Sequence, residues 1–188
     1  MRVFIVRHGE SETNRDGLWT GCLDVALTQK GREDAALARG LLSYVKFDKI
    51  YSSDLQRAKC TAEIAIPGCR YETSALLREI NVGDIAGKPL HVVKDSEGKL
   101  LNKDGYACFG GESRAEFCDR VKFFMRELEG LDCQNVVVFA HAGVLRTFLE
   151  VVLNTKVPGA HICCRNCTVA IFEYDAQDWK LHSWINLS

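Results

Sequence analysis

Two histidines in this sequence each follow a short apolar run and come within two residues of a glycine. His8 follows the apolar residues 3–6, and His141 follows the apolar residues 136–139. A neutral imidazole is able to act as a nucleophile near pH 7 and form a covalent intermediate, and a second imidazole supplies a cationic donor when it is protonated. Either histidine alone is more simply a hydrogen-bonded structural residue, but their shared context favours a reactive pair.

Two arginines occupy comparable positions. Arg7 precedes the first histidine, and Arg57 lies one turn into a predicted helix that opens near Asp54. A guanidinium fork matches phosphate oxygens bidentately, and a helix N-terminus adds backbone donors for an anion. A lone arginine is usually a solvated surface residue. Together with the histidines, these arginines predict a site for phosphoryl transfer, which depends on positioning and charge stabilisation.

Transfer from an ester also requires an acid for the leaving oxygen. Glu79 follows an apolar pair at 76–77 and precedes a glycine-rich stretch, so it is the candidate acid. Judged from its neighbours alone, it is better interpreted as a solvent-exposed glutamate.

The elements that must position these residues alternate between strand and helix. Strands are predicted at residues 3–6, around Ile50, and at 69–73, 136–139, 168–174 and 180–185. Helices are predicted after Thr28, after a cap at Ser53 or Asp54, from the capping box at 113–116, and after residues 141–143 through about 153. This order predicts a three-layer α/β/α sandwich with a mainly parallel central sheet and a C-terminal hairpin. Ligands of such sheets bind beyond the carboxyl ends of the strands, where the histidines and arginines would meet.

Length and composition indicate one ordinary globular domain. We expect a single domain over residues 1–188, with a small cap insertion at about 80–111 that is rich in glycine and shows little periodicity. The formal net charge of −1 provides no general attraction to nucleic acid or to an anionic membrane, so neither is expected as a partner. Anion binding must therefore be local.

Cysteine usage and the N-terminus indicate the compartment. The first apolar run is too short for a signal peptide, no segment approaches the ~20 apolar residues of a membrane helix, and nine cysteines are present. We therefore expect a cytoplasmic protein with reduced thiols. Cys163, Cys164 and Cys167 have ligand-like spacing, but no second pair accompanies them and His161 does not complete a zinc pattern; small buried side chains are the favoured interpretation.

Five segments of the chain resemble, in order, motifs of the histidine phosphatase superfamily, the phosphoglycerate-mutase-like enzymes. They are VRHGESETN, YSSDLQRAKCTAEI, LLREINVGDIAG, FGGES and FAHAGVLRTFL, and the similarity runs from residue 2 to about residue 174. The triplet Arg-His-Gly alone would be a weak signal, whereas five ordered motifs are specific. The resemblance implies a phosphoglycerate-mutase-like fold and a phosphohistidine intermediate.

The resemblance also implies roles for individual residues. His8 would become phosphorylated, and Arg7, Arg57 and His141 would hold the transferring phosphoryl group. Glu79 would protonate the leaving alcohol and then activate water as a base. Because the arginines and the second histidine supply the positive charge, no metal or cofactor is expected.

Residues on the substrate side follow from the same resemblance. Asn14, six residues after His8, would be a further phosphate ligand, and Thr20 and Gly21 match substrate-side positions. In the predicted cap, an exposed loop is favoured, with contact of one or two side chains to substrate as the alternative. The side chains concerned are Lys88, His91, Lys94, Lys99, Lys103 and Tyr106.

Departures from the mutase pattern favour hydrolysis. Cofactor-dependent mutases typically have tryptophan at the position of Thr13, Gly-Trp at 21–22, and Arg-His-Tyr-Gly at 80–83, where this chain has Ile-Asn-Val-Gly. They also carry a long insertion with an Arg-Arg pair, whereas only about thirty residues separate Glu79 from the FGGES motif here. A phosphatase must admit water to the phosphohistidine, and a short insertion leaves the site open to water.

The predicted activity is therefore a phosphomonoester hydrolase acting on a small phosphorylated metabolite. The segment LREINVGDIAG resembles small bacterial phosphatases, including α-ribazole phosphatases and broad-specificity enzymes, although the aromatic residue often found near Ile85 is missing. Candidate substrates are α-ribazole 5′-phosphate and sugar phosphates. The alternatives are a cofactor-dependent phosphoglycerate mutase and a non-catalytic relative; the second would have lost a catalytic residue, and none is lost.

Overall fold

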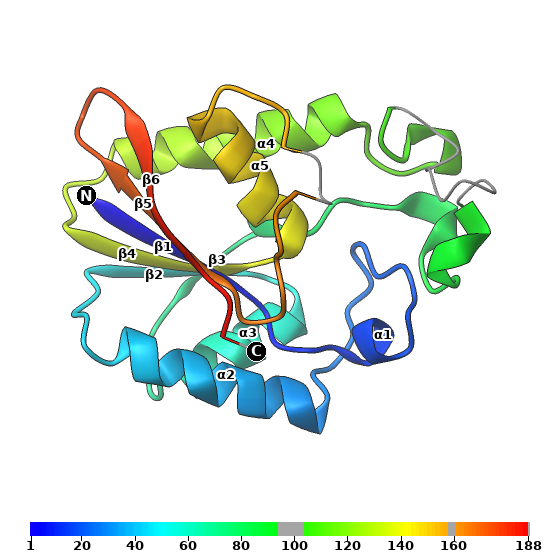
Figure 1. Cartoon of the computed structure of the whole chain (residues 1–188), viewed down its shortest axis with the longest axis horizontal. Helices are drawn as coiled ribbons and strands as arrows, with labels where there is room; N and C mark the ends of the chain where they lie inside the picture. The colour runs from blue at the N-terminus through cyan, green and yellow to red at the C-terminus, as the bar shows by residue number, and fades with distance from the viewer. Residues whose placement is uncertain (94–103, 158–160, 188) are drawn as a thin grey trace.

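One six-stranded sheet, in the order β3-β2-β4-β1-β5-β6, organises the chain (Figure 1). The computed structural model describes residues 1–93, 104–157 and 161–187. The strands are β1 (Arg2–Arg7), β2 (Lys49–Ser53), β3 (Glu72–Ser74), β4 (Asn135–Ala140), β5 (Val169–Tyr174) and β6 (Trp179–Ile185). The helices are α1 (Glu12–Arg15), α2 (Gln29–Leu42), α3 (Gln56–Ala65), α4 (Arg114–Glu129) and α5 (Ala142–Val152).

The sheet is mainly parallel, as predicted. Strands β3, β2, β4 and β1 run parallel to their neighbours, whereas β5 is antiparallel to both β1 and β6. The register of β1 and β4 pairs Arg7 with Ala140, and the His8 amide continues the ladder by donating to the Ala140 carbonyl at 3.0 Å. The residues that follow the two strands, His8 and His141, therefore lie level with each other.

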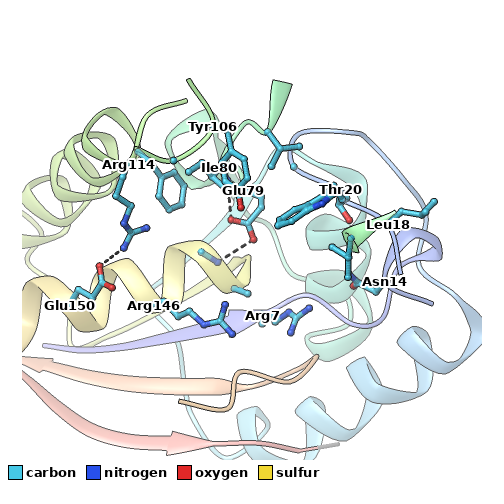
Figure 2. A pocket seen from close by; sticks show the side chains of 18 of the residues that line it. Arg7, Asn14, Leu18, Thr20, Glu79, Ile80, Tyr106, Arg114, Arg146 and Glu150 are labelled. Carbon is cyan, nitrogen blue, oxygen red and sulfur yellow. Dashed lines mark hydrogen bonds and ion pairs between the residues drawn. The ribbon is translucent and has the colours of Figure 1, made fainter. Parts of the chain in front are cut away.

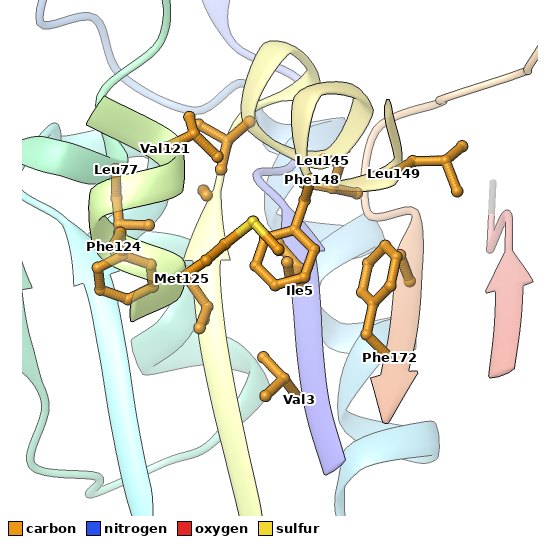
Figure 3. Close-up of a cluster of buried hydrophobic side chains, with 14 of the residues drawn as sticks. Val3, Ile5, Leu77, Val121, Phe124, Met125, Leu145, Phe148, Leu149 and Phe172 are labelled. Carbon is orange, nitrogen blue, oxygen red and sulfur yellow. The ribbon is translucent and has the colours of Figure 1, made fainter. Parts of the chain in front are cut away.

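Helices cover both faces of the sheet, which confirms the three-layer prediction. Side chains alternate between faces along a strand, so Val3 and Ile5 pack against α4 and α5, while Phe4 and Val6 pack on the side of α2 and α3. Figure 3 shows the first of these clusters, in which Phe148 of α5 packs close to Phe172 of β5. Burial on both faces explains why β1 and β4 are continuous apolar runs.

Two of the predicted helix caps are present, and one is wrong. Thr28 accepts from the Gly31 amide at the start of α2, and Ser113 forms the capping box of α4. Helix α3 begins later than predicted: its N-cap is Leu55, which provides no side-chain cap.

Asp24, which is distant in the sequence, replaces the predicted cap of α3. Asp24 Oδ1 accepts from the Gln56 amide at 2.7 Å. Asp54 instead forms an ion pair with Arg78 at 2.6 Å.

The strand predicted at 69–73 also begins later than predicted. The Cys69 amide donates back to the Ile66 carbonyl, and pairing with β2 starts at Glu72.

The segment between Glu79 and α4 is irregular, as predicted. Its described part contains the 3-10 turns η2 (Gly83–Ile85), η3 (Leu90–Val93) and η4 (Ala107–Phe109). Residues 94–103 of the predicted cap lie outside the described residues, and with them Lys94, Lys99 and Lys103. No helix of the described chain is long and apolar enough to cross a lipid bilayer.

All nine cysteines are unpaired. Cys164 and Cys167 are buried beside β5, as the sequence suggested, whereas Cys163 is exposed. Within the described residues, no three His, Cys, Asp or Glu side chains are grouped closely enough to hold a metal ion.

Candidate active site

Three residues from different elements meet beyond the ends of β1 and β4. The ring centroids of His8 and His141 are 5.1 Å apart, and the Arg57 Nε lies 3.3 Å from the His8 Nε2. We call these three residues the histidine–arginine cluster. They are more deeply buried than a site at the edge of the sheet would require, with exposed fractions of 4% for His8 and 0% for the other two.

The His8 ring is held in one orientation. Its Nδ1 lies 2.6 Å from the Gly9 carbonyl oxygen, and a carbonyl only accepts, so Nδ1 carries the proton and Nε2 presents its lone pair. Burial first, and then the charges of Arg57 and Arg7, hold the pKa of His8 well below its usual range. The imidazole is therefore neutral at pH 7, the form needed for a nucleophile.

Two glycines fix the backbone next to His8. A Cβ on Gly9 would lie 2.1 Å from the Gly31 carbonyl oxygen, and a Cβ on Gly31 would lie 2.1 Å from the Glu10 carbonyl oxygen. The Gly9 amide also donates to Thr61 Oγ1 of α3 at 3.1 Å. The loop after β1 is thus packed directly on the first turn of α2 and tied to α3.

Among the described residues, neither ring nitrogen of His141 has a hydrogen-bond partner. Burial, followed by the charges of Arg57 and His8, lowers the pKa of His141 well below its usual range. Sequence reasoning treated this imidazole as a donor when protonated. In this arrangement it is neutral, and a neighbouring phosphoryl dianion would raise its pKa by favouring the charged form.

The two arginines are anchored by backbone carbonyls. Arg57 donates from Nη1 to the Leu23 carbonyl at 2.6 Å and from Nη2 to the Gly21 carbonyl at 2.8 Å. Burial lowers the pKa of Arg57 to about 10, so it remains charged at pH 7. Arg7 donates from Nη1 to the Cys164 carbonyl, and its buried Nε has no partner in the part of the chain that the structure describes.

Glu79 lies opposite Arg7 on the wall of a cavity, not in open solvent (Figure 2). One carboxylate oxygen accepts from the Gly143 amide at 3.1 Å, and the other accepts from the Ile80 amide at 2.9 Å. A Cβ on Gly143 would lie 2.1 Å from Glu79 Oε1. The glycine that follows His141 by two residues is therefore what allows the carboxylate to sit at this position.

Arg120 holds the backbone that carries Glu79, and sequence reasoning missed it. Its guanidinium donates to the Leu76 and Arg78 carbonyls at 2.8 Å and to the Glu79 carbonyl at 3.1 Å. It also forms a bidentate ion pair with Glu112 at 2.8 Å. Glu112 belongs to the FGGES motif, which was the available signal that this segment matters.

The cavity beside the cluster has a volume of about 620 Å³. All three residues predicted on the substrate side, Asn14, Thr20 and Gly21, line it together with Arg7 and Glu79. Asn14 Oδ1 accepts from Asn166 Nδ2 at 3.2 Å, and Thr20 Oγ1 lies 2.6 Å from Thr13 Oγ1. The histidine–arginine cluster is not part of the lining, because it lies deeper than the cavity surface.

Aromatic side chains line the outer part of the cavity. Trp19 and Tyr106 pack edge to face with ring centroids 5.5 Å apart. Tyr106 is thus a predicted cap residue that reaches the cavity, while Lys88 and His91 are exposed and lie outside its lining. Trp19 was not predicted, because nothing in its local sequence distinguishes it from a core tryptophan.

Comparison with known proteins agrees with this arrangement. Residues 3–187 match the histidine phosphatase superfamily (branch 1). The chain belongs to this superfamily. Both the superfamily and the phosphoglycerate-mutase-like fold predicted from the sequence are thereby confirmed.

Relatives within the histidine phosphatase superfamily carry two kinds of name. The chain is 33% identical over 158 residues to the adenosylcobalamin/alpha-ribazole phosphatase of Salmonella typhimurium, covering 77% of this chain and 76% of that protein. It is 29% identical over 195 residues to the "Probable phosphoglycerate mutase GpmB" of Salmonella paratyphi A, covering 98% and 90%. The crystal structure of phosphoglycerate mutase from Thermus thermophilus superposes with a TM-score of 0.76 at 29% identity and covers 100% of both chains.

Proposed function

We propose that this protein hydrolyses phosphomonoesters, without a metal or other cofactor, through a phosphohistidine formed at His8. The observation that carries the proposal is the state of His8: a buried neutral imidazole, with its Nδ1 proton directed to Gly9 and its Nε2 lone pair next to Arg57. A histidine with a purely structural role has no need to be held neutral with an acceptor nitrogen turned toward an arginine.

In the first half-reaction, His8 Nε2 attacks phosphorus while the bond from phosphorus to the ester oxygen breaks. Arg7, Arg57 and His141 stabilise the charge on the equatorial oxygens. The Arg57 Nε exchanges its hydrogen bond with Nε2 for one with a phosphoryl oxygen. Glu79, in its protonated form, transfers a proton to the departing alkoxide, and the alcohol leaves.

In the second half-reaction, water attacks the phosphohistidine. Glu79, now a carboxylate, takes a proton from the water as the P–N bond breaks, and His8 returns to its neutral form. Inorganic phosphate is released. Asn14 is a further ligand of the phosphoryl group, and Thr20 and Gly21 line the cavity on the side where the alcohol portion would lie.

The substrate is a small phosphorylated metabolite. A cavity of about 620 Å³ accommodates a group much larger than phosphate, which suits α-ribazole 5′-phosphate or a sugar phosphate. Likeness to the Salmonella typhimurium phosphatase supports the first of these. Nine unpaired cysteines support action in the reducing cytoplasm.

Mutase activity is the competing assignment, because a relative named as a phosphoglycerate mutase aligns over 98% of the chain. A mutase must retain its intermediate and transfer the phosphoryl group back to it. The arginine and tyrosine with which mutases hold a phosphoglycerate after the acid are replaced by Ile80 and Val82 here. We therefore favour transfer to water.

The test is phosphate release from a panel of phosphomonoesters in EDTA. The panel contains α-ribazole 5′-phosphate, several sugar phosphates, p-nitrophenyl phosphate, and 3-phosphoglycerate with and without its bisphosphate primer. Release without metal, together with an acid-labile phosphoprotein that is lost in the His8→Ala variant, supports the proposal. Interconversion of phosphoglycerates without net phosphate release would replace it with the mutase assignment, and a strict metal requirement would refute metal independence.

A further inference from the structure

The loop that precedes β5 lies against the end of β1. Strand β5 is antiparallel to β1, with Val169 opposite Val6, so the residues just before β5 lie beside the residues that follow β1. Two contacts hold Arg7 there: its amide donates to the Thr168 carbonyl at 2.9 Å, and its guanidinium donates to the Cys164 carbonyl. This loop is therefore in direct contact with the candidate active site.

One side chain of this loop, Asn166, contacts two residues of the site. Asn166 Nδ2 donates to the His8 carbonyl at 3.2 Å and to Asn14 Oδ1 at 3.2 Å. A backbone carbonyl only accepts hydrogen bonds, so the contact with His8 determines which end of the Asn166 carboxamide is the nitrogen. The side chain of Asn166 therefore faces Asn14 as a donor.

The carboxamide of Asn14 is oriented by a second main-chain group. The Ser11 amide donates to Asn14 Oδ1 at 3.3 Å, and a backbone N–H only donates. Two donors, one from Ser11 and one from Asn166, thus hold the oxygen of Asn14. The His8 carbonyl and the Ser11 amide together impose one orientation on both carboxamides.

This orientation leaves the nitrogen of Asn14 available to a ligand. Asn14 lines the cavity, on the side of Thr20 (Figure 2), and its Nδ2 has no hydrogen-bond partner in the described part of the chain. An ionised phosphoryl group presents acceptor oxygens, so it pairs with an amide nitrogen and repels an amide oxygen. Turning the Asn14 carboxamide over would present its oxygen to the phosphoryl group and place its nitrogen against two other donors.

We propose that Asn166 is a positioning residue for phosphoryl transfer, which holds the carboxamide of Asn14 with its nitrogen available to the phosphoryl oxygens. The inference rests on the proposed function, and in particular on Asn14 as a phosphoryl ligand. Asn166 is not part of the cavity lining, so it acts through Asn14. A donor that is oriented before the substrate arrives needs no reorganisation during the reaction.

A double-mutant cycle between positions 14 and 166 tests the proposal. Asn14→Ala should lower kcat/KM for p-nitrophenyl phosphate by about 10- to 100-fold, the value of a hydrogen bond to a charged group. Asn166→Ala should lower it by about tenfold, because the carboxamide of Asn14 can then turn over. The double variant should lie within about threefold of Asn14→Ala, because no carboxamide is left to position. Two losses that multiply would overturn the proposal.

The contact of Asn166 with the His8 carbonyl has little weight in this cycle. That carbonyl also accepts from the Cys167 amide at 3.3 Å, so it keeps a donor when Asn166 is replaced. The isosteric variant Asn166→Asp keeps the shape of the side chain but has no N–H donor. It should lose at least as much activity as Asn166→Ala, and wild-type activity in this variant would refute the proposal.

A matched control separates positioning from a general disturbance of the loop. The exposed Asn186 accepts from the Arg165 amide and from Thr168 Oγ1, so Asn186→Ala loosens the same loop without removing a contact to Asn14. Its activity should stay near wild type, and any small loss should persist in the Asn14→Ala background. A loss at position 186 that disappeared there would belong to the loop as a whole and would contradict the assignment to Asn166.

Binding of inorganic phosphate keeps the inference testable if the proposed function fails. Failure of the function appears as no phosphate release from any ester, including p-nitrophenyl phosphate. Calorimetry of inorganic phosphate with wild type, the two single variants and the double variant then measures the same coupling as dissociation constants. Weaker binding in Asn166→Ala that is absent in the Asn14→Ala background supports the inference. Equal weakening in both backgrounds, no weakening, or no phosphate binding by wild type refutes it.

Discussion

The histidine–arginine cluster and the outer wall of the cavity are built from different kinds of structure. His8 and His141 follow adjacent parallel strands whose register is fixed by a continuous ladder, and Arg57 is buried on α3. Trp19 and Tyr106 belong instead to connecting segments outside the main helices and strands. In the proposed function, residues held by the core of the sheet carry out the chemistry, and residues of the connecting segments contact the substrate.

The largest effect is expected at the cluster. His8→Ala removes the nucleophile, and we expect kcat for p-nitrophenyl phosphate to fall by about 10⁴-fold or more. Urea unfolding monitored by circular dichroism should still show a cooperative transition. Appreciable turnover by a clean preparation of this variant would exclude His8 as the nucleophile.

Glu79 lies between the two regions, and the loss of activity on replacing it should depend on the leaving group of the ester. Glu79→Gln should slow alkyl phosphates by about 10² to 10⁴-fold, because their alkoxides require a proton, and aryl phosphates much less. The measurement is the slope of log kcat/KM against the pKa of the leaving alcohol, which should steepen. Equal losses for both ester classes would make Glu79 a binding residue instead of an acid.

Gly143 tests whether the position of that carboxylate matters. In Gly143→Ala, the new methyl group would overlap Glu79 Oε1 and displace the carboxylate. We expect a loss of about tenfold or more on alkyl esters, with the same leaving-group dependence as Glu79→Gln. The matched control is Gly40→Ala on α2, where a Cβ meets nothing within 4 Å. That variant should keep full activity and gain up to about 1 kcal/mol of stability.

The burial of both histidines predicts a pH-dependent stability. Their pKa values are lower in the folded protein than the usual 6.5, so the unfolded chain binds more protons below that pH. Their contribution to the free energy of unfolding is fully present above about pH 6.5. It decreases as the pH falls from there toward the folded pKa values, by about 1.4 kcal/mol per histidine for each pH unit. The free energy of unfolding in urea at pH 7.5 and 5.5 measures this. His141→Gln should reduce the difference and exposed His182→Gln should not; equal slopes for both variants would contradict the assignment.

The smallest effect is expected at the outer wall. Tyr106→Ala should change kcat/KM by about tenfold or less, and by different factors for different alcohols, while kcat for p-nitrophenyl phosphate stays near wild type. A uniform loss across the substrate panel would place Tyr106 with the catalytic residues and remove the distinction between the two regions.

Much of the arrangement was predictable because it depends on pattern and parallel strand order. Apolar runs identified β1 and β4, and the parallel order placed His8 and His141 together. The missing parts are contacts between polar groups far apart in the chain: the amide cap from Asp24, the Arg120 guanidinium on the Glu79 carbonyl, and the Gly143 amide on Glu79. None has a local signature. The residues next to Glu79 in the sequence therefore favoured a solvent-exposed glutamate. Only the resemblance to the histidine phosphatase superfamily indicated that Glu79 belongs to the site.

The reciprocal contact of Gly9 and Gly31 limits which substitutions this protein tolerates, in evolution and in engineering. Since a Cβ at either position meets a backbone carbonyl oxygen at 2.1 Å, neither glycine can be exchanged singly, even for alanine, without moving the loop that carries His8. A library that varies positions 19 and 106 leaves this contact untouched. Selection for new substrates therefore has room at the cavity mouth. The first turn of α2 tolerates no such variation, although no residue of that helix lines the cavity.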